Sequence, residues 1–327
     1  MSDDVVVKKK TDFASEKVMF YPFYSGPKSF SFVLKSVLFY AIGLALLSLI
    51  FGQSILEANI AYQEQILHNP KNATPAFFAL LGKSLPYFLG LWVLWAMIEA
   101  ALFRRIYRGP DNSMFPWRFG KDELRVMLCQ LVAYIVFIVA LFMSWLVFLA
   151  IVMFFSVFSN GTILWLLELL SVVGTVIITA AVMIRFAPAA SRSVAQNRIA
   201  LGSVWPVAYK RFWPAFGSYA ILAIVGAIIY IILAMLVSLA VYGPETLQYL
   251  KNILSGDVAK TLEHSRELAQ NGGFNVRTIF TTGLTNMYFA AFSLCIAGVA
   301  VYLNILYDKG QKGSEKDNGK EMVLEQA

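Results

Sequence analysis

The longest apolar run of the chain reads VMLCQLVAYIVFIVALFMSWLVFLAIVMFFSVF over residues 126–158, and it contains no charged residue. Its 33 residues would form a helix about 50 Å long at 1.5 Å per residue. A bilayer hydrocarbon core is roughly 30 Å thick, so a single helix crosses it with residues to spare. We interpret the run as a membrane span that is tilted or extends past the interface.

Five further apolar runs complete the pattern of a polytopic membrane protein. A membrane-spanning helix needs about 20 apolar residues, and each run supplies that length. We therefore predict an all-α transmembrane domain over residues 30–306, with six transmembrane helices at about residues 30–51, 84–103, 126–158, 162–184, 214–241 and 284–306. A polar, basic segment precedes it over residues 1–29, and a Lys/Glu/Gly-rich tail follows over residues 307–327. Because the tail has no apolar period, we expect it to be disordered.

The segments beside the spans carry further predictions. Residues 55–67 and 244–271 have apolar residues at helical spacing, so we expect amphipathic helices in the first and fifth loops. Pro86 stands near the start of the second predicted span, and we place it in the first helical turn, where proline is tolerated. Similar basic-aromatic segments precede the first, third and fifth spans, which favours three helical hairpins.

Composition excludes several classes of protein. Hydrophobic residues make up 58% of the chain and charged residues 14%, against about 25% charged residues in a soluble domain. A soluble enzyme, a disordered chain and a secreted disulfide scaffold are thereby excluded. Cys129 and Cys295 stand alone in apolar runs, and His68 and His264 are the only histidines. We therefore expect no metal site, no cofactor and no redox chemistry.

Basic residues are distributed unevenly between the two sides of the predicted membrane domain. The formal net charge is +7, and 21 of the 27 Lys and Arg residues fall on the side that holds both termini and the second and fourth loops. The positive-inside rule assigns that side to the cytoplasm, so we predict that both termini are cytoplasmic. Lys and Arg beside membrane spans suit anionic lipid headgroups. We expect membrane lipids as partners, a membrane protein as a further candidate partner, and no nucleic acid.

Two carboxylates fall within the predicted spans. Glu99 lies in the second span, close to Arg104 and Arg105, and Glu168 lies near the start of the fourth. An uncompensated charge at the bilayer centre costs about 3 kcal/mol on insertion scales, so such residues are candidate functional groups. Two interpretations stay open for each: an interfacial carboxylate that snorkels or pairs with arginine, and a transport or proton-carrying group.

Residues 185–213 form a connector with five basic residues and no acidic residue. Tryptophan rings sit at headgroup depth while Lys and Arg meet phosphates. The candidate lipid- or anion-binding residues are therefore Arg185, Arg192, Arg198, Trp205, Lys210, Arg211 and Trp213. Of these, Arg192, Lys210 and Arg211 are expected to contact anionic headgroups on the cytoplasmic face. The alternative is that these charges only orient the connector during membrane insertion.

The same connector carries a resemblance to a known family. Its pattern is Arg185-Phe186-x-x-Ala189, then Ser203-x-Trp205, then Lys210-Arg211-Phe212-Trp213. It resembles the six-helix membrane domain of the glycerophosphodiester phosphodiesterase group and of related uncharacterised bacterial inner-membrane proteins. The resemblance implies a six-helix fold in a bacterial inner membrane. It transfers no catalytic residue, because no segment here matches the separate soluble catalytic domain of that phosphodiesterase.

Three hypotheses for function follow. The first is a non-enzymatic integral protein of the inner membrane that binds lipid or a membrane partner, or assists transport. The alternative is a small secondary transporter that uses Glu99, Glu168 and Arg185 as coupling groups. The third, an intramembrane lipid-modifying enzyme, lacks an evident nucleophile–base pair. A polar cavity between the spans would favour the transporter, and a dry core would favour a scaffold.

Overall fold

The computed structural model describes residues 18–26, 28–69, 71, 73–109, 117–156, 161–209, 211–243, 251, 255, 263 and 276–324. Within this part the chain is 91% helical and has no strand. The helices are α2 (Tyr21–Tyr24), α3 (Ser29–His68), α4 (Ala73–Arg108), α5 (Lys121–Ser156), α6 (Gly161–Phe186), α7 (Pro188–Gln196), α8 (Trp205–Tyr209), α9 (Phe212–Tyr242) and α12 (Val276–Leu324).

Six of these helices, α3, α4, α5, α6, α9 and α12, are long and apolar enough to cross a membrane. The prediction of an all-α, multi-pass membrane protein with six transmembrane helices is therefore confirmed. The cytoplasmic placement of both termini stays a prediction that rests on the distribution of Lys and Arg. The predicted amphipathic segment over residues 244–271 falls outside the described residues, except for Lys251, Ser255 and Glu263.

Several helix boundaries differ from the predicted ones. Residues 55–67 continue α3, so the amphipathic helix predicted in the first loop is the far end of the first span. The placement of Pro86 in a first turn was wrong, because α4 begins at Ala73 and Pro86 lies inside it. Residues 73–82 are themselves mostly apolar and extend the helix, and Pro86 then removes the single hydrogen bond that would reach the Gly82 carbonyl.

The chain beyond residue 306 is helical where composition predicts a disordered tail. Helix α12 continues from the sixth span as far as Leu324. Extending an existing helix forms one hydrogen bond for each residue that is ordered, whereas starting a new helix is costly. The preceding span thus supplies the nucleus for a polar extension that would not form a stable helix alone.

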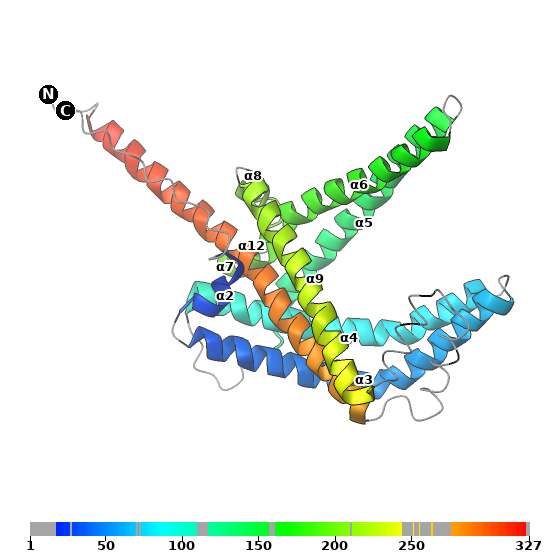
Figure 1. The fold of residues 1–327 in the computed structure, drawn as a ribbon. Coiled ribbons are helices and arrows are strands. Elements are labelled where there is room, and N and C mark those ends of the chain that lie inside the picture. The colour runs from blue at the N-terminus through cyan, green and yellow to red at the C-terminus, as the bar shows by residue number, and fades with distance from the viewer. Residues whose placement is uncertain are drawn as a thin grey trace.

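The six spans pair as three antiparallel hairpins, α3 with α4, α5 with α6, and α9 with α12. Glycines allow the close approach in each hairpin. A Cβ on Gly43 would lie 2.7 Å from a Leu94 methyl group, and a Cβ on Gly226 would overlap the Phe292 ring. The three hairpins meet around α7 and diverge from it, as Figure 1 shows. This agrees with the three hairpins that the basic-aromatic entry segments predicted.

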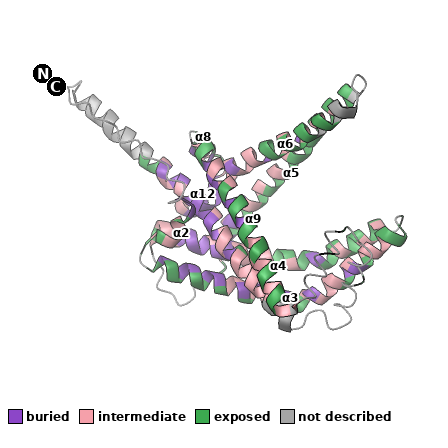
Figure 2. Ribbon diagram, in the orientation of Figure 1, coloured by how far each residue is buried: buried purple, intermediate pink, exposed green. Residues whose placement is uncertain are grey.

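Burial is concentrated where the hairpins meet. We call this region the hub; it consists of α7 and the parts of α4, α5 and α12 that pack on it. Phe103 of α4, Leu294 of α12 and Val194 of α7 are almost completely buried there. Figure 2 shows buried residues around α7 and α12 and exposed residues along the outer parts of α5, α6 and α9. The outer parts are apolar, which suits contact with lipid rather than water.

Candidate functional site

A cavity of about 910 Å³ lies between the spans, and it is partly open to the surroundings. Its wall is built from α3, α4, α5, α6, α9 and α12, with one residue from α7, and it is mostly apolar. Ligand sites in proteins typically enclose roughly 300–1,000 Å³ and combine an apolar wall with a few convergent polar groups. The polar side chains of this wall are Tyr40, Tyr87, Trp95, Glu99, Gln130, Tyr134, Tyr219, Asn286 and Ser293.

Glu99 reaches this cavity from α4 and is held in place from α5. Gln130 Nε2 donates to Glu99 Oε2 at 2.7 Å. Trp92 Nε1 donates to Gln130 Oε1 at 2.6 Å, so the orientation of the Gln130 amide is fixed at both ends. Trp95, another wall residue, stands four residues before Glu99 on α4. These contacts hold a carboxylate at the cavity wall.

The carboxylate of Glu99 has no cationic partner among the described residues. The described ion pairs do not include it. The nearby Arg104 instead pairs with Glu123 of α5, and the guanidinium of Arg105 lies 5.1 Å from the centre of the Phe32 ring. The interfacial interpretation of Glu99 included a pair with one of these arginines. The described contacts do not contain such a pair.

Tyr219 brings a second polar group to the same wall from α9. Its hydroxyl is buried and has no hydrogen-bond partner in the described part of the structure. It lies close enough to Glu99 for the charge of that carboxylate to act on it. A buried hydroxyl without a partner costs about 1–3 kcal/mol, and a ligand that offers a partner would recover that cost.

Glu168, the other candidate carboxylate, belongs to α6, but its side chain lies outside the described residues. Cys129 also lines the cavity, and its thiol shares a hydrogen bond of 3.1 Å with the Ser193 hydroxyl. Within the described residues, no three His, Cys, Asp or Glu side chains lie close enough together to hold a metal ion.

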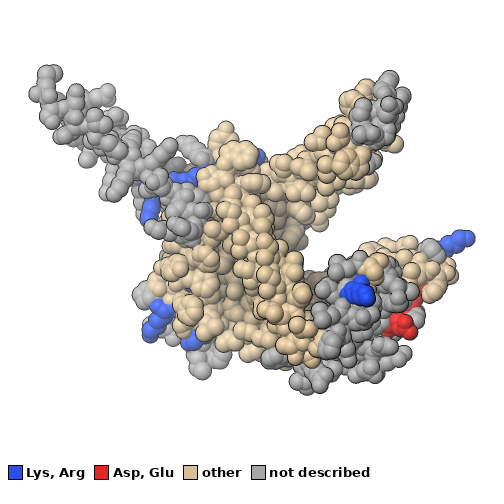
Figure 3. All heavy atoms as spheres, viewed as in Figure 1, with Lys and Arg blue, Asp and Glu red and all other residues tan. Residues whose placement is uncertain are grey.

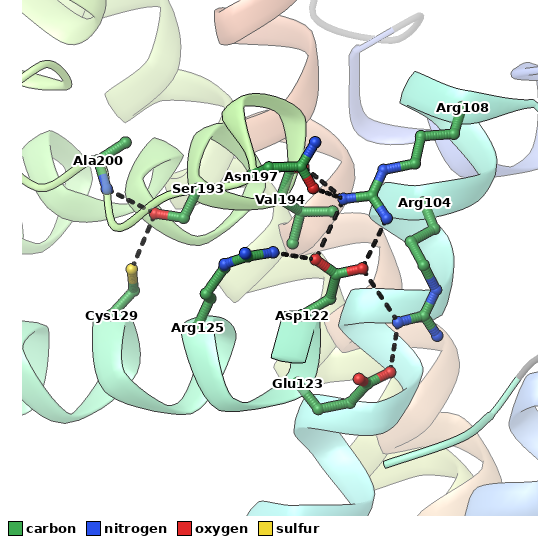
Figure 4. A network of polar contacts seen from close by, with 10 residues as sticks. All are labelled: Arg104, Arg108, Asp122, Glu123, Arg125, Cys129, Ser193, Val194, Asn197 and Ala200. Carbon is green, nitrogen blue, oxygen red and sulfur yellow. Dashed lines mark hydrogen bonds and ion pairs between the residues drawn. The ribbon is translucent and has the colours of Figure 1, made fainter. Parts of the chain in front are cut away.

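A network of ion pairs fixes the hub next to the cavity (Figure 4). Arg104 pairs with Glu123, whose side chain is 1% exposed, and Arg108 and Arg125 both pair with Asp122. Because buried charges are stable only when paired, this network holds the end of α4 against the start of α5. The acidic members of the network, Asp122 and Glu123, lie between Arg118 and Arg125. Two neighbouring carboxylates within a basic segment were the feature of the sequence that could have indicated this network.

The network extends to the end of α7. Asn197 follows this helix with φ of 57°, a left-handed conformation that asparagine tolerates better than most residues. There Arg108 Nη2 donates to the Asn197 side-chain oxygen at 2.7 Å and to the Val194 carbonyl at 2.8 Å. One arginine thus satisfies the open end of α7 and ties it to α4 and α5.

The first part of the predicted connector lies inside the protein rather than on its surface. Helix α7 occupies its first part, and Ser191 and Ser193 are completely buried. Arg192, expected to contact headgroups, lies with its side chain 12% exposed against α12, where Asp308 Oδ1 is 3.3 Å from its guanidinium. It also lies over the Tyr307 ring. The connector has no acidic residue of its own, but α12 supplies one from 116 residues away.

The remaining connector residues lie nearer the surface. Arg185 places its guanidinium 4.5 Å from the centre of the Trp205 ring and 5.9 Å from that of Phe212. Trp213 is 74% exposed, and Arg211 is half-buried. Arg198 is exposed and bonds only locally, to Gln196. Lys210 lies outside the described residues.

Charged side chains are sparse on the membrane-spanning surface. Figure 3 shows a broad uncharged face over α9 and the α5–α6 hairpin, with Lys and Arg on the hub side and at the far end of the α3–α4 hairpin. The described part thus has basic residues gathered at the hub and an apolar belt beyond it. This is the charge pattern of a protein surrounded by lipid.

Comparison of the chain with protein-family models, with curated proteins and with solved structures finds no match. The resemblance to the membrane domain of the glycerophosphodiester phosphodiesterase group therefore stays a prediction. What the chain is shown to be is an integral, multi-pass membrane protein.

Proposed function

We propose that this membrane protein binds a lipid or a similar amphiphile in the cavity between its spans. The observation that carries the proposal is the cavity itself, with about 910 Å³ of largely apolar space and a small group of polar side chains at Glu99. An apolar wall accepts an acyl or alkyl chain, and polar groups at one place orient the end of such a chain. The cavity is partly open, so a molecule from the bilayer has a route into it.

A binding role is better supported than catalysis. Glu99 accepts a hydrogen bond from the Gln130 amide, and Cys129 shares a hydrogen bond with the Ser193 hydroxyl. No described Ser or Cys of the wall is hydrogen-bonded to Glu99, whereas an activated nucleophile needs a base within that reach. We accordingly propose a protein that holds or presents a lipid, in the inner membrane of a bacterium, with both termini in the cytoplasm.

A second lipid contact is proposed at the connector. Arg185 rests on Trp205, and the exposed Trp213 and half-buried Arg211 lie at the start of α9. Cations beside aromatic rings at the end of a span favour the anionic headgroups of the cytoplasmic leaflet. Arg192 is left out of this surface because its guanidinium contacts Asp308.

Transport is the second candidate, and the position of Glu99 at the cavity wall favours it. A transporter must alternate between two openings of its site, whereas a lipid-binding protein needs one. Arg185, another coupling group of that hypothesis, faces Trp205 rather than the cavity. Of the two members of this set whose side chains are described, Glu99 is placed to contact a substrate and Arg185 is not.

The experiment that tests the binding proposal fills the cavity and counts retained lipid. Ala133 lines the cavity on α5, and Ala150 lies exposed on the same helix. We expect Ala133→Trp to lower the amount of lipid that stays bound in native mass spectrometry at least fivefold, while Ala150→Trp leaves it unchanged. Both variants are first checked for a monodisperse elution profile. Equal lipid retention in a monodisperse Ala133→Trp protein would contradict the proposal.

A further inference from the structure

We infer that the polar part of the cavity wall, formed by Glu99, Gln130 and Tyr219, recognises a protonated amine on the bound amphiphile. This inference rests on the proposed function and names the chemical class of its ligand. The three side chains come from α4, α5 and α9, so the recognition site forms only when the three hairpins are assembled.

Charge is the first argument. Glu99 is the acidic residue of the described cavity wall, and the described wall contains no Lys, Arg or His. A ligand with a carboxylate or phosphate at this place would face a carboxylate with no cation beside it. A cationic group compensates that carboxylate inside an apolar site, where unpaired charges are most costly.

Unused hydrogen-bonding capacity is the second argument. Gln130 occupies one oxygen of Glu99, and a carboxylate has about four acceptor positions in total. The Tyr219 oxygen has no partner in the described structure and can accept a further bond. An alkylammonium group carries three N–H donors, which is enough for one bond to each of Glu99 and Tyr219. A neutral alcohol can also bond to both, by donating to Glu99 and accepting from the Tyr219 hydroxyl, so the preference for an amine rests on charge.

The aromatic character of the wall is the third argument. Trp95, Tyr134 and Tyr219 line the cavity together with Glu99. The faces of such rings attract ammonium groups, and the attraction is stronger where water is excluded. A carboxylate that shares the cavity wall with aromatic rings is therefore suited to an organic ammonium ion, and the rest of the cavity is suited to its alkyl chain.

The test uses the full-length protein in lipid nanodiscs and three probes with the same chain, dodecylamine, dodecanol and dodecanoate, each brominated at carbon 4, close to the polar end. Bromine quenches tryptophan fluorescence at short range, and Trp95 is in the wall. The quenching lost in a Trp95→Phe variant measures occupancy of the cavity. We expect dodecylamine to bind at least tenfold more tightly than dodecanol, and dodecanoate to bind most weakly.

Variants assign the preference to its residues. Glu99→Gln should lower the affinity for dodecylamine about tenfold, which equals about 1.4 kcal/mol, and should leave dodecanol unchanged. Tyr219→Phe should lower dodecylamine affinity about threefold. Glu57→Gln is the control, because Glu57 is exposed on α3 and bonds only to Gln53. Equal affinities for amine and alcohol, or tighter binding of dodecanoate, would overturn the inference that the site recognises an amine. The proposal that an amphiphile binds in the cavity would still stand. Absence of quenching at Trp95 by any probe would overturn the proposed function itself.

Discussion

Removing the carboxylate of Glu123 is expected to destabilise the hub strongly. Glu123 is 1% exposed and receives a hydrogen bond from Arg104, whose side chain is 7% exposed, so Glu123→Gln leaves a buried guanidinium without its nearest counter-charge. Removing one partner of a buried ion pair typically costs about 3–5 kcal/mol. Asp122 lies 3.7 Å from the same guanidinium and compensates in part, so we expect a loss near the lower end, about 3 kcal/mol.

The assay is reversible unfolding of the purified protein in mixed micelles, followed by circular dichroism. Arg125→Gln is the control, because its pair with Asp122 joins residues three apart on one helix and its side chain is 21% exposed. Pairs within one helix turn contribute about 0.3–0.5 kcal/mol when exposed, and this partly buried pair is expected to contribute about 1 kcal/mol, well below the Arg104–Glu123 pair. The double variant Arg104→Met with Glu123→Met should regain most of the lost stability, since apolar side chains can replace a buried pair. A Glu123→Gln loss no larger than that of Arg125→Gln would refute the reasoning.

Three further outcomes are expected. Gly226→Leu should separate α9 from α12, because its side chain would overlap Phe292, and cross-linking between the two helices should fall. Asn304→Leu should lower the free energy of unfolding by about 2 kcal/mol, because the Pro188 carbonyl and Ser191 hydroxyl lose a buried donor, and the micelle assay measures this. If the Lys/Arg distribution sets the orientation of the protein in the membrane, an impermeant thiol reagent applied from outside should label Lys71→Cys and spare Arg198→Cys. The reverse labelling would show that the protein has the opposite orientation.

The number and nature of the spans could be predicted because they depend on local properties of the chain. A run such as residues 126–158 specifies a span by length and hydropathy alone. Exact helix ends were less predictable. The helix α4 begins 13 residues before Pro86 because residues 73–82 also suit a helix. Pro86 removes one backbone hydrogen bond, and this loss is too small to end the helix.

The candidate site was only partly predictable for a different reason. Glu99 stood out because a carboxylate in an apolar run is rare and costly. Gln130 and Tyr219 did not stand out, because the role of a polar residue in a span depends on which helices pack beside it. Asp308, the partner of Arg192, was unpredictable for the same reason. The sequence around Arg192 indicates a basic, lipid-facing loop, whereas Asp308 meets it from the other end of the chain.

The most direct test of the cavity proposal is a structure determined by electron cryo-microscopy on protein reconstituted in nanodiscs of native membrane lipid. The proposal predicts an elongated, non-protein density in the cavity between α4, α5, α6, α9 and α12, with one end beside the Glu99 carboxylate and the unpaired Tyr219 hydroxyl. The contrary result is a cavity closed by movement of the α5–α6 hairpin toward α9, with Glu99 paired to a protein cation and no density between the spans.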